Sequence, residues 1–180
     1  KVLRLLQFQE VATENRLRNL PSLDLEELTF DYQSDRTFQI LKASSTKRLT
    51  LEFTPGEPEV AYLQDFLKVQ RKLEYLHFIG TGDELDPFKS NAFSNVNFSL
   101  KTLRLRDLLI PNTQNFFEFI NGHVETLTRV ELLYVSSNLI LNCLKNVKRI
   151  KELTFGSVEQ QKALDFEVRG NVEELDIRMT

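Results

Sequence analysis

Few residues in this chain could act as nucleophiles, general bases or soft metal ligands. The sequence contains two histidines, His77 and His123, and a single cysteine, Cys143. A zinc site, or a nucleophile activated by a base, needs several such groups brought together. We expect His77 to face solvent on a strand, His123 to lie in a loop or at a helix end, and Cys143 to be a small buried residue.

Acidic pairs and glycine motifs give no stronger indication of catalysis. The neighbours Glu26 and Glu27 fall within an expected strand, so they should point to opposite faces and cannot form an acid/base pair. Neither a G-x-x-x-x-G-K-[ST] loop nor a G-x-S-x-G turn occurs, and the stretch 80–83 reads as a turn after a strand. The sequence therefore predicts no catalytic residue, no metal site and no cofactor, and we expect a protein that is not an enzyme.

The elements that would position any functional residue are short strands that recur along the chain. In each strand, apolar residues occupy the first, fourth and sixth of six consecutive positions, with Thr46 as the one exception. The eight candidates are Leu3-Leu6-Phe8, Leu25-Leu28-Phe30, Thr46-Leu49-Leu51, Leu73-Leu76-Phe78, Leu100-Leu103-Leu105, Leu127-Val130-Leu132, Ile150-Leu153-Phe155 and Val172-Leu175-Ile177. Because alternate strand residues face opposite ways, the second and third apolar residues should enter one core.

The spacing of these strands indicates a repeat protein. The middle residues at 28, 49, 76, 103 and 130 are separated by 21, 27, 27 and 27 positions. This L-x-x-L-x-L pattern with its period resembles the leucine-rich-repeat superfamily over residues 1–180. The resemblance implies an α/β fold, a curved solenoid of about eight repeats with parallel strands on the concave side.

Helical periodicity between the strands predicts the convex side. The apolar residues at 60–69, 116–120 and 139–147 recur at helical spacing, whereas the shorter intervals leave room only for brief helices or turns. The slot three residues after the last strand residue is Gln33, Thr54, Thr81, Leu108, Val135 and Val158 rather than the usual Asn or Cys. This irregularity resembles the intracellular ribonuclease-inhibitor and F-box-associated repeats.

The outward strand positions of the middle repeats predict a partner-binding surface. Aromatic and Arg side chains beside exposed aliphatic residues are typical of interaction hot spots. The candidate residues are Tyr75, His77, Ile79, Arg104, Arg106, Arg129 and Leu133. The alternative is that Arg104 pairs with Glu131, and Arg129 with Glu152, as ordinary cross-strand ladders that contribute little.

Composition narrows the class of protein and of partner. Hydrophobic residues make up 41% of the chain and charged residues 27%, with a net charge of -3, which is typical of an ordered protein. The acidic total disfavours nucleic acid as the partner, and no apolar run suits a membrane span. A lone cysteine fits a reducing, intracellular location, cytoplasmic or nuclear.

The resemblance to F-box-associated repeats suggests that the protein functions by binding other proteins. It implies a protein-interaction domain that recognises substrates for a cullin-based ubiquitin ligase, with the docking module elsewhere. The segment 20–32 is not itself an F-box, because Leu28, Phe30 and Tyr32 alternate as in a strand. A structural or regulatory scaffold subunit, and less readily an RNA-binding protein, are the alternatives. Since no polar cap flanks the outer strands, we expect an excerpt of a longer protein, or ends covered by a partner.

Overall fold

The computed structural model describes residues 2–5, 23–32, 44–53, 60–80, 96–108, 113–135, 150–157 and 174–177, together with Phe88, Phe93 and Ile110. Its elements in chain order are β1 (Val2–Leu5), β2 (Asp24–Tyr32), β3 (Ser45–Phe53), α3 (Val60–Val69), β4 (Tyr75–Ile79), β5 (Thr102–Arg106), α4 (Thr113–Gly122), β6 (Arg129–Val135), β7 (Glu152–Ser157) and β8 (Glu174–Ile177).

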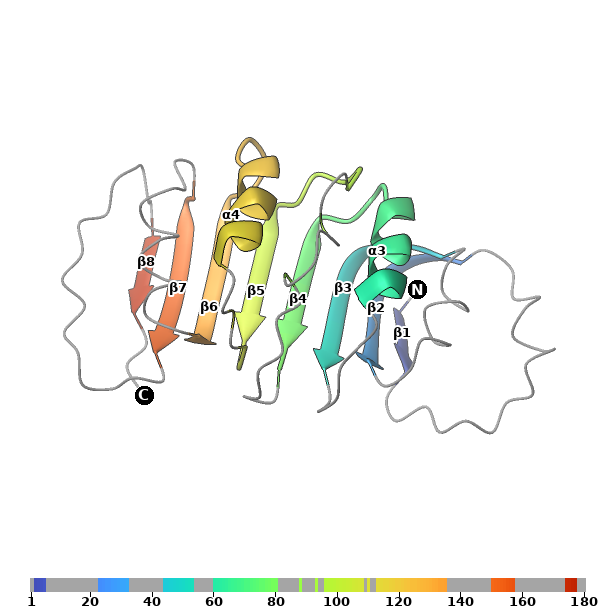
Figure 1. Ribbon diagram of the computed structural model, residues 1–180, viewed down its shortest axis with the longest axis horizontal. Coiled ribbons are helices and arrows are strands. Elements are labelled where there is room, and N and C mark those ends of the chain that lie inside the picture. Colours follow the sequence, from blue (N-terminus) through green and yellow to red (C-terminus); the bar gives the residue numbers. More distant parts are fainter. Residues whose placement is uncertain are drawn as a thin grey trace.

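The strands form one open parallel sheet in which each strand lies beside its neighbour in the chain, from β1 to β8. Figure 1 shows this order across the long axis of the molecule, with α3 and α4 in front of the same face. Parallel neighbours require a crossover between them, and here α3 and α4 belong to two of those crossovers. The chain is therefore an α/β protein built from a repeated strand-and-connection unit.

The register confirms the predicted repeat alignment for all strands except the first. One row of paired residues runs through Leu28, Leu49, Leu76, Leu103, Val130, Leu153 and Leu175. In β1, however, Leu3 pairs with Leu28, whereas Leu6 was the expected partner. The segment Leu3-Arg4-Leu5-Leu6 offers two overlapping apolar alternations, so the local pattern could not choose between them.

Two rows of apolar side chains form the core on the helix-bearing face. The first runs from Leu28 to Leu153 in the register just described, and the second contains Leu51, Phe78, Leu105, Leu132 and Phe155, all of which are essentially fully buried. Helix α3 adds Leu63, Phe66 and Leu67, and α4 adds Phe116, Phe119 and Ile120. These positions repeat at intervals of three and four, which gives each helix one apolar stripe facing the sheet.

Aromatic rings fill the space between the sheet and α4. The Phe78 ring on β4 lies 5.9 Å from Phe88 and 5.7 Å from Phe93. Phe88 in turn lies 5.0 Å from Phe116 and Phe93 lies 5.1 Å from Phe119. Edge-on and tilted ring pairs of this kind contribute beyond their buried area. The centre of the core thus depends on phenylalanines that lie outside the strand pattern as well as on those within it.

A buried glutamine joins two neighbouring repeats. Gln70 follows α3 and is completely buried, and its Oε1 accepts a hydrogen bond of 3.0 Å from the Thr46 amide. Its Nε2 donates to the Ser44 carbonyl at 2.8 Å and to Phe66 at 3.3 Å. Buried backbone groups at the start of β3 are thereby satisfied by a side chain from the next repeat. No local pattern in the sequence marks Gln70 for this role.

Gly80, Asp107 and Tyr134 are spaced 27 residues apart and lie at or near the ends of three successive strands. The Gly80 amide after β4 donates to the Arg106 carbonyl at 2.8 Å, and the Asp107 amide donates to the Leu133 carbonyl at 3.0 Å. Asp107 and Tyr134 both have positive φ angles, of 52° and 56°. A Cβ on Gly80 would lie 2.2 Å from the Asp107 carbonyl oxygen. Only glycine allows this close approach of the two backbones.

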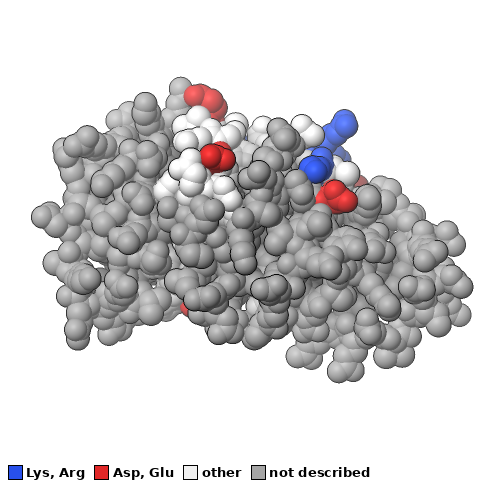
Figure 2. All heavy atoms as spheres, viewed as in Figure 1, with Lys and Arg blue, Asp and Glu red and all other residues white. Residues whose placement is uncertain are grey.

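The described residues on the helix side of the sheet include few charged groups. Figure 2 views the helix side, on which uncharged atoms lie over α4 and a few charged groups lie over α3 and α4. Exposed residues of these helices include Asp65, Lys68 and Glu118. The side chains that alternate with the two core rows point to the opposite side of the sheet, which we call the open face.

Candidate functional site

The pairing of neighbouring strands that aligns the core residues also aligns the side chains of the open face in rows. Its three rows across β3 to β6 are Arg48-Tyr75-Thr102-Arg129, Thr50-His77-Arg104-Glu131 and Glu52-Ile79-Arg106-Leu133. All seven predicted partner-binding residues lie in these rows, on the adjacent strands β4, β5 and β6. The predicted residues therefore form one continuous surface. Whether a partner uses it stays a prediction.

Tyr75 lies between two arginines from the neighbouring strands. The guanidinium carbon of Arg48 lies 4.0 Å from the centroid of the Tyr75 ring, a cation–π arrangement. On the other side, Arg104 donates from Nη1 to the Tyr75 hydroxyl at 3.4 Å. Burial disfavours the charge on Arg104, but the Tyr75 hydroxyl and Glu131 outweigh it and raise the Arg104 pKa. Both guanidinium groups thus lie against the same tyrosine side chain.

A chain of ion pairs continues from Arg104 toward β7. Arg104 Nε lies 2.6 Å from Glu131 Oε2, at an angle that does not make a hydrogen bond. Arg129 Nε donates to the other Glu131 oxygen at 3.0 Å, and Arg129 Nη1 lies 3.1 Å from Glu152 Oε2. Both ion pairs of the alternative interpretation, Arg104 with Glu131 and Arg129 with Glu152, are present. In addition, two arginines, Arg104 and Arg129, share the nearly buried Glu131 carboxylate. The sequence did not predict this sharing.

We predicted that His77 faces solvent, and this prediction is wrong. His77 occupies the open face, but only 8% of it is exposed. The Tyr75 ring stands edge-on to it at 6.3 Å, and Arg104 pairs with it in register on β5. Burial, together with the positive charges of Arg104 and Arg106, lowers the pKa of His77 to about 4. The imidazole is therefore neutral at pH 7, because long neighbouring side chains exclude water from it.

The last row of the face places two aliphatic side chains beside an arginine. Arg106 is exposed and donates from Nε to Asp107 at 3.1 Å, and its guanidinium carbon lies 6.0 Å from the Tyr134 ring. Ile79 and Leu133 are half-buried beside it. Two aliphatic side chains flank an arginine here, as in the predicted hot spot.

His123 is buried on the other side of the sheet and takes no part in the open face. It follows α4 directly, as predicted, and stacks on the Phe98 ring at 5.3 Å with 11° between the planes. Phe119 stands edge-on to it at 4.8 Å. Burial lowers the pKa of His123 to about 4. Cys143 and the predicted helix at 139–147 lie outside the described residues.

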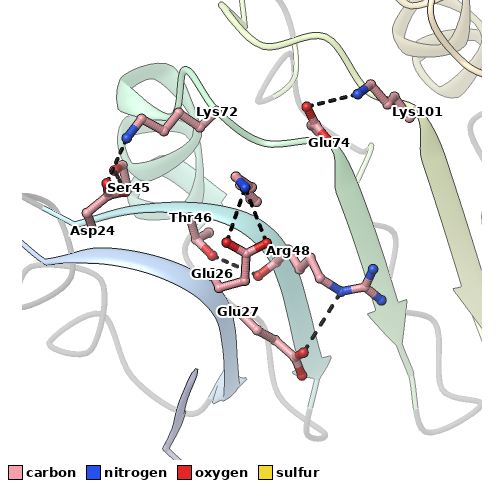
Figure 3. Close-up of polar contacts among 10 residues, drawn as sticks. Asp24, Glu26, Glu27, Ser45, Thr46, Arg48, Lys72, Glu74 and Lys101 are labelled. Atoms are coloured by element: carbon pink, nitrogen blue, oxygen red, sulfur yellow. Dashed lines mark hydrogen bonds and ion pairs between the residues drawn. The ribbon is translucent and has the colours of Figure 1, made fainter. Parts of the chain in front are cut away.

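Glu26 and Glu27 are neighbours in β2 and bind different residues, as expected for side chains that point to opposite faces of a strand. Glu26 pairs with Lys47 at 3.2 Å, whereas Glu27 pairs with Arg48 at 3.9 Å (Figure 3). Asp24 binds Lys72 at 2.8 Å and accepts a hydrogen bond from Ser45, and these contacts lower the Asp24 pKa. The figure shows these pairs side by side, from Asp24 to the Glu74–Lys101 pair between β4 and β5.

Other kinds of site receive no support from the described part of the chain. No group of three or more histidine, cysteine, aspartate or glutamate residues within it could hold a metal ion. None of its helices is long and apolar enough to cross a membrane. No protein-family model, no curated protein and no solved structure matches this chain. The open face is thus the candidate site that its own geometry supports best.

Proposed function

We propose that this chain is a leucine-rich-repeat domain that binds a protein partner through the open face, on the concave side of a curved solenoid. The observation that carries the proposal is the meeting of Tyr75, Ile79, Arg104, Arg106, Arg129 and Leu133 on three adjacent strands. Aromatic, arginine and aliphatic groups in one patch are the composition of protein-binding hot spots. A rigid sheet holds them in fixed register, which lowers the entropy lost on binding.

Within this class, we propose the role of a substrate-recognition domain in an F-box-type ubiquitin-ligase adaptor, acting inside the cell. The irregular 21- to 27-residue spacing of the strands supports this role through its likeness to F-box-associated repeats. In such an adaptor the open face would hold the substrate, and a docking module would hold the ligase core.

A second candidate is a scaffold subunit of a stable assembly. The observation that favours it is the ladder from Arg104 through Glu131 and Arg129 to Glu152, which pairs charges within the face itself. A surface with its charges already paired suits permanent, shape-based packing better than charge-directed capture of changing substrates.

Affinity capture from cells tests both candidates. The bait is the tagged protein, compared with the triple variant Tyr75→Ala, Arg104→Ala, Arg129→Ala. A matched control replaces Lys68 and Arg71, which are exposed on the helix side and in the following turn. The urea unfolding midpoint of each bait establishes that it is folded.

The recovered proteins separate the candidates. Cullin and other ligase subunits, together with substrates that the triple variant loses, support the adaptor. A fixed set of non-ligase subunits supports the scaffold, and nuclease-sensitive recovery would indicate RNA. If the folded triple variant recovers every partner that the wild type recovers, the open face is not the binding surface.

A further inference from the structure

The last two residues of α4, Asn121 and Gly122, form a chemically reactive pair. A backbone nitrogen can attack the side-chain amide of the asparagine before it, and glycine at the following position has no Cβ to obstruct this attack. Of the twelve asparagines in the chain, only Asn121 precedes a glycine. The sequence therefore offers one position at which this reaction meets the least steric resistance.

The structure leaves this pair open to solvent. Asn121 and Gly122 are both exposed at the end of α4. Apart from the helix itself and the adjoining residues, no atom lies within 4 Å of the place that a Cβ on Gly122 would take. No neighbouring element of the described chain therefore covers the glycine, and water reaches the Asn121 amide.

The end of α4 is also the part of the helix that should open most readily. A helical backbone keeps Cγ of Asn121 away from the Gly122 nitrogen, so the last turn must unwind before the two atoms can meet. This turn carries no basic residue that would stabilise the negative end of the helix dipole. The Val124 amide donates to the Asn121 carbonyl at 3.4 Å, which is long for a hydrogen bond. Local opening should therefore cost less here than in the middle of α4.

Asn115 provides a comparison within the same helix. Its Nδ2 donates a hydrogen bond of 2.7 Å to the Phe88 carbonyl, which holds the side-chain amide in place. The residue that follows it is Phe116, whose ring is fully buried in the core. Both the amide and the neighbouring backbone are thus fixed at Asn115, whereas Asn121 is exposed.

We propose that Asn121 deamidates in the folded protein through a cyclic imide formed with Gly122. The Gly122 nitrogen forms a bond to Cγ of Asn121, and the bond from Cγ to the side-chain nitrogen breaks. That nitrogen leaves as ammonia and takes the Gly122 amide proton with it. Water, the only co-reactant, then opens the imide at either of its carbonyl carbons and yields aspartate or isoaspartate. The open face takes no part, because α4 covers the core side of the sheet.

The product alters the turn that holds His123. The His123 amide donates to the Ile120 carbonyl at 3.0 Å, and the Leu127 amide donates to the His123 carbonyl at 2.8 Å. The buried imidazole packs against Phe98 and Phe119. Isoaspartate adds a carbon atom to the main chain just before this turn, and either product places a negative charge at the negative end of the helix dipole. We therefore expect the modified protein to have a lower urea unfolding midpoint.

The test incubates the whole folded protein at mildly alkaline pH, which favours loss of the Gly122 amide proton, in water enriched in the heavy oxygen isotope. Digestion in ordinary water and fragmentation of the peptides by mass spectrometry then locate each mass gain. We expect Asn121 to become a carboxylate that carries one heavy oxygen atom, while Asn115 stays unchanged. An isoaspartyl methyltransferase with labelled S-adenosylmethionine should detect isoaspartate, which direct hydrolysis of the amide would not produce.

Variants assign the reaction to this pair. Gly122→Ala should slow it at least about tenfold, a rise of about 1.4 kcal/mol in the barrier, because a Cβ obstructs the attacking nitrogen. Asn121→Gln should abolish the product over the same period, since a longer side chain closes a ring less readily. Lys68→Gln, at an exposed position on α3, is the matched control and should react as the wild type does. Urea midpoints establish that each variant is folded.

The protein unfolded in urea shows how fast the pair reacts without the fold. If the unfolded chain gains heavy oxygen at Asn121 and the folded protein does not, the fold protects the pair and the inference is wrong. Equal rates in the wild type and Gly122→Ala, or equal gains at Asn115 and Asn121, would also overturn it. An unchanged urea midpoint of the reacted protein would contradict the expected effect on the turn at His123.

Discussion

The two faces of the sheet use alternate residues of the same strands in different ways. On β4, Leu76 and Phe78 are fully buried against α4 and its neighbours, whereas Tyr75 and Ile79 are half-buried on the open face. The core face holds the strands together by excluding water, and the open face joins them through ion pairs and one aromatic ring. A single strand can therefore supply stability on one side and specificity on the other.

The clearest way to break this comparison is to remove one ring from the core. Phe78→Ala deletes a fully buried ring that contacts Phe53, Phe88 and Phe93, so we expect a loss of about 3–5 kcal/mol in the free energy of unfolding. Urea denaturation measures it. Ile79→Ala, one residue along on the open face, should cost much less. Equal costs for the two variants would mean that the open face is also a core.

The two histidines sharpen the comparison through pH. Both have a pKa of about 4 in the folded protein, against 6.5 when exposed, so the folded state resists protonation while the unfolded state does not. Stability should be complete above pH 6.5 and fall as the pH drops from 6.5 toward 4. Each histidine should contribute up to about 1.4 kcal/mol per pH unit in that window.

Variants separate the two histidine contributions. His123→Phe keeps a ring against Phe98 and should remove about half of the pH dependence. His77→Gln should remove the other half, and urea midpoints across this pH range measure both effects. If neither variant changes the slope, the histidines are not buried in the folded protein.

Glycine substitutions test the close approach at the strand ends. Gly80→Ala would press a Cβ against the Asp107 carbonyl, and we expect a loss of about 1–3 kcal/mol. Gly122→Ala is the matched control, because nothing lies within 4 Å of its Cβ and alanine favours the helix end. Thermal unfolding should show opposite signs for the two variants. A neutral Gly80→Ala would mean that β4 and β5 do not meet in this way.

The smallest expected effect is on the open face itself. Arg129 and Glu152 are 48% and 45% exposed in their side chains, so their coupling should be only about 0.2–1 kcal/mol. A double-mutant cycle with Arg129→Gln and Glu152→Gln measures this coupling. A value well above that range would show that the ladder stabilises the fold and is more than a surface feature.

Much of the architecture follows from the sequence because strand periodicity is local. The alternation at Leu76 and Phe78, repeated at Leu103 and Leu105, predicted both the buried rows and the residues opposite them. The helices at 60–69 and 113–122 also agree with their apolar spacing. The prediction for the first strand was wrong, since Leu3-Arg4-Leu5-Leu6 carries two possible alternations and only pairing with β2 selects one.

The sequence predicted which residues share the open face, but it did not predict the contacts that these residues make with one another. Arg48 stood in the same row as Tyr75, and that shared row was the signal that could have added it to the set. Nothing local revealed that Glu131 would be shared, or that Gln70 would reach across to Thr46. The Arg104–Glu131 and Gln70–Thr46 contacts join residues more than twenty positions apart, and their geometry depends on neighbouring repeats.

The sequence by itself determined which residues of β2 to β7 face the core, because a period of two needs no knowledge of the rest of the chain. It determined the order of the repeats through their spacing as well. Only the tertiary structure decided the register of β1, the burial of His77 and the contacts of Arg48 and Arg104 with Tyr75. Burial and pairing depend on the side chains that neighbouring strands bring alongside, and no single strand encodes them.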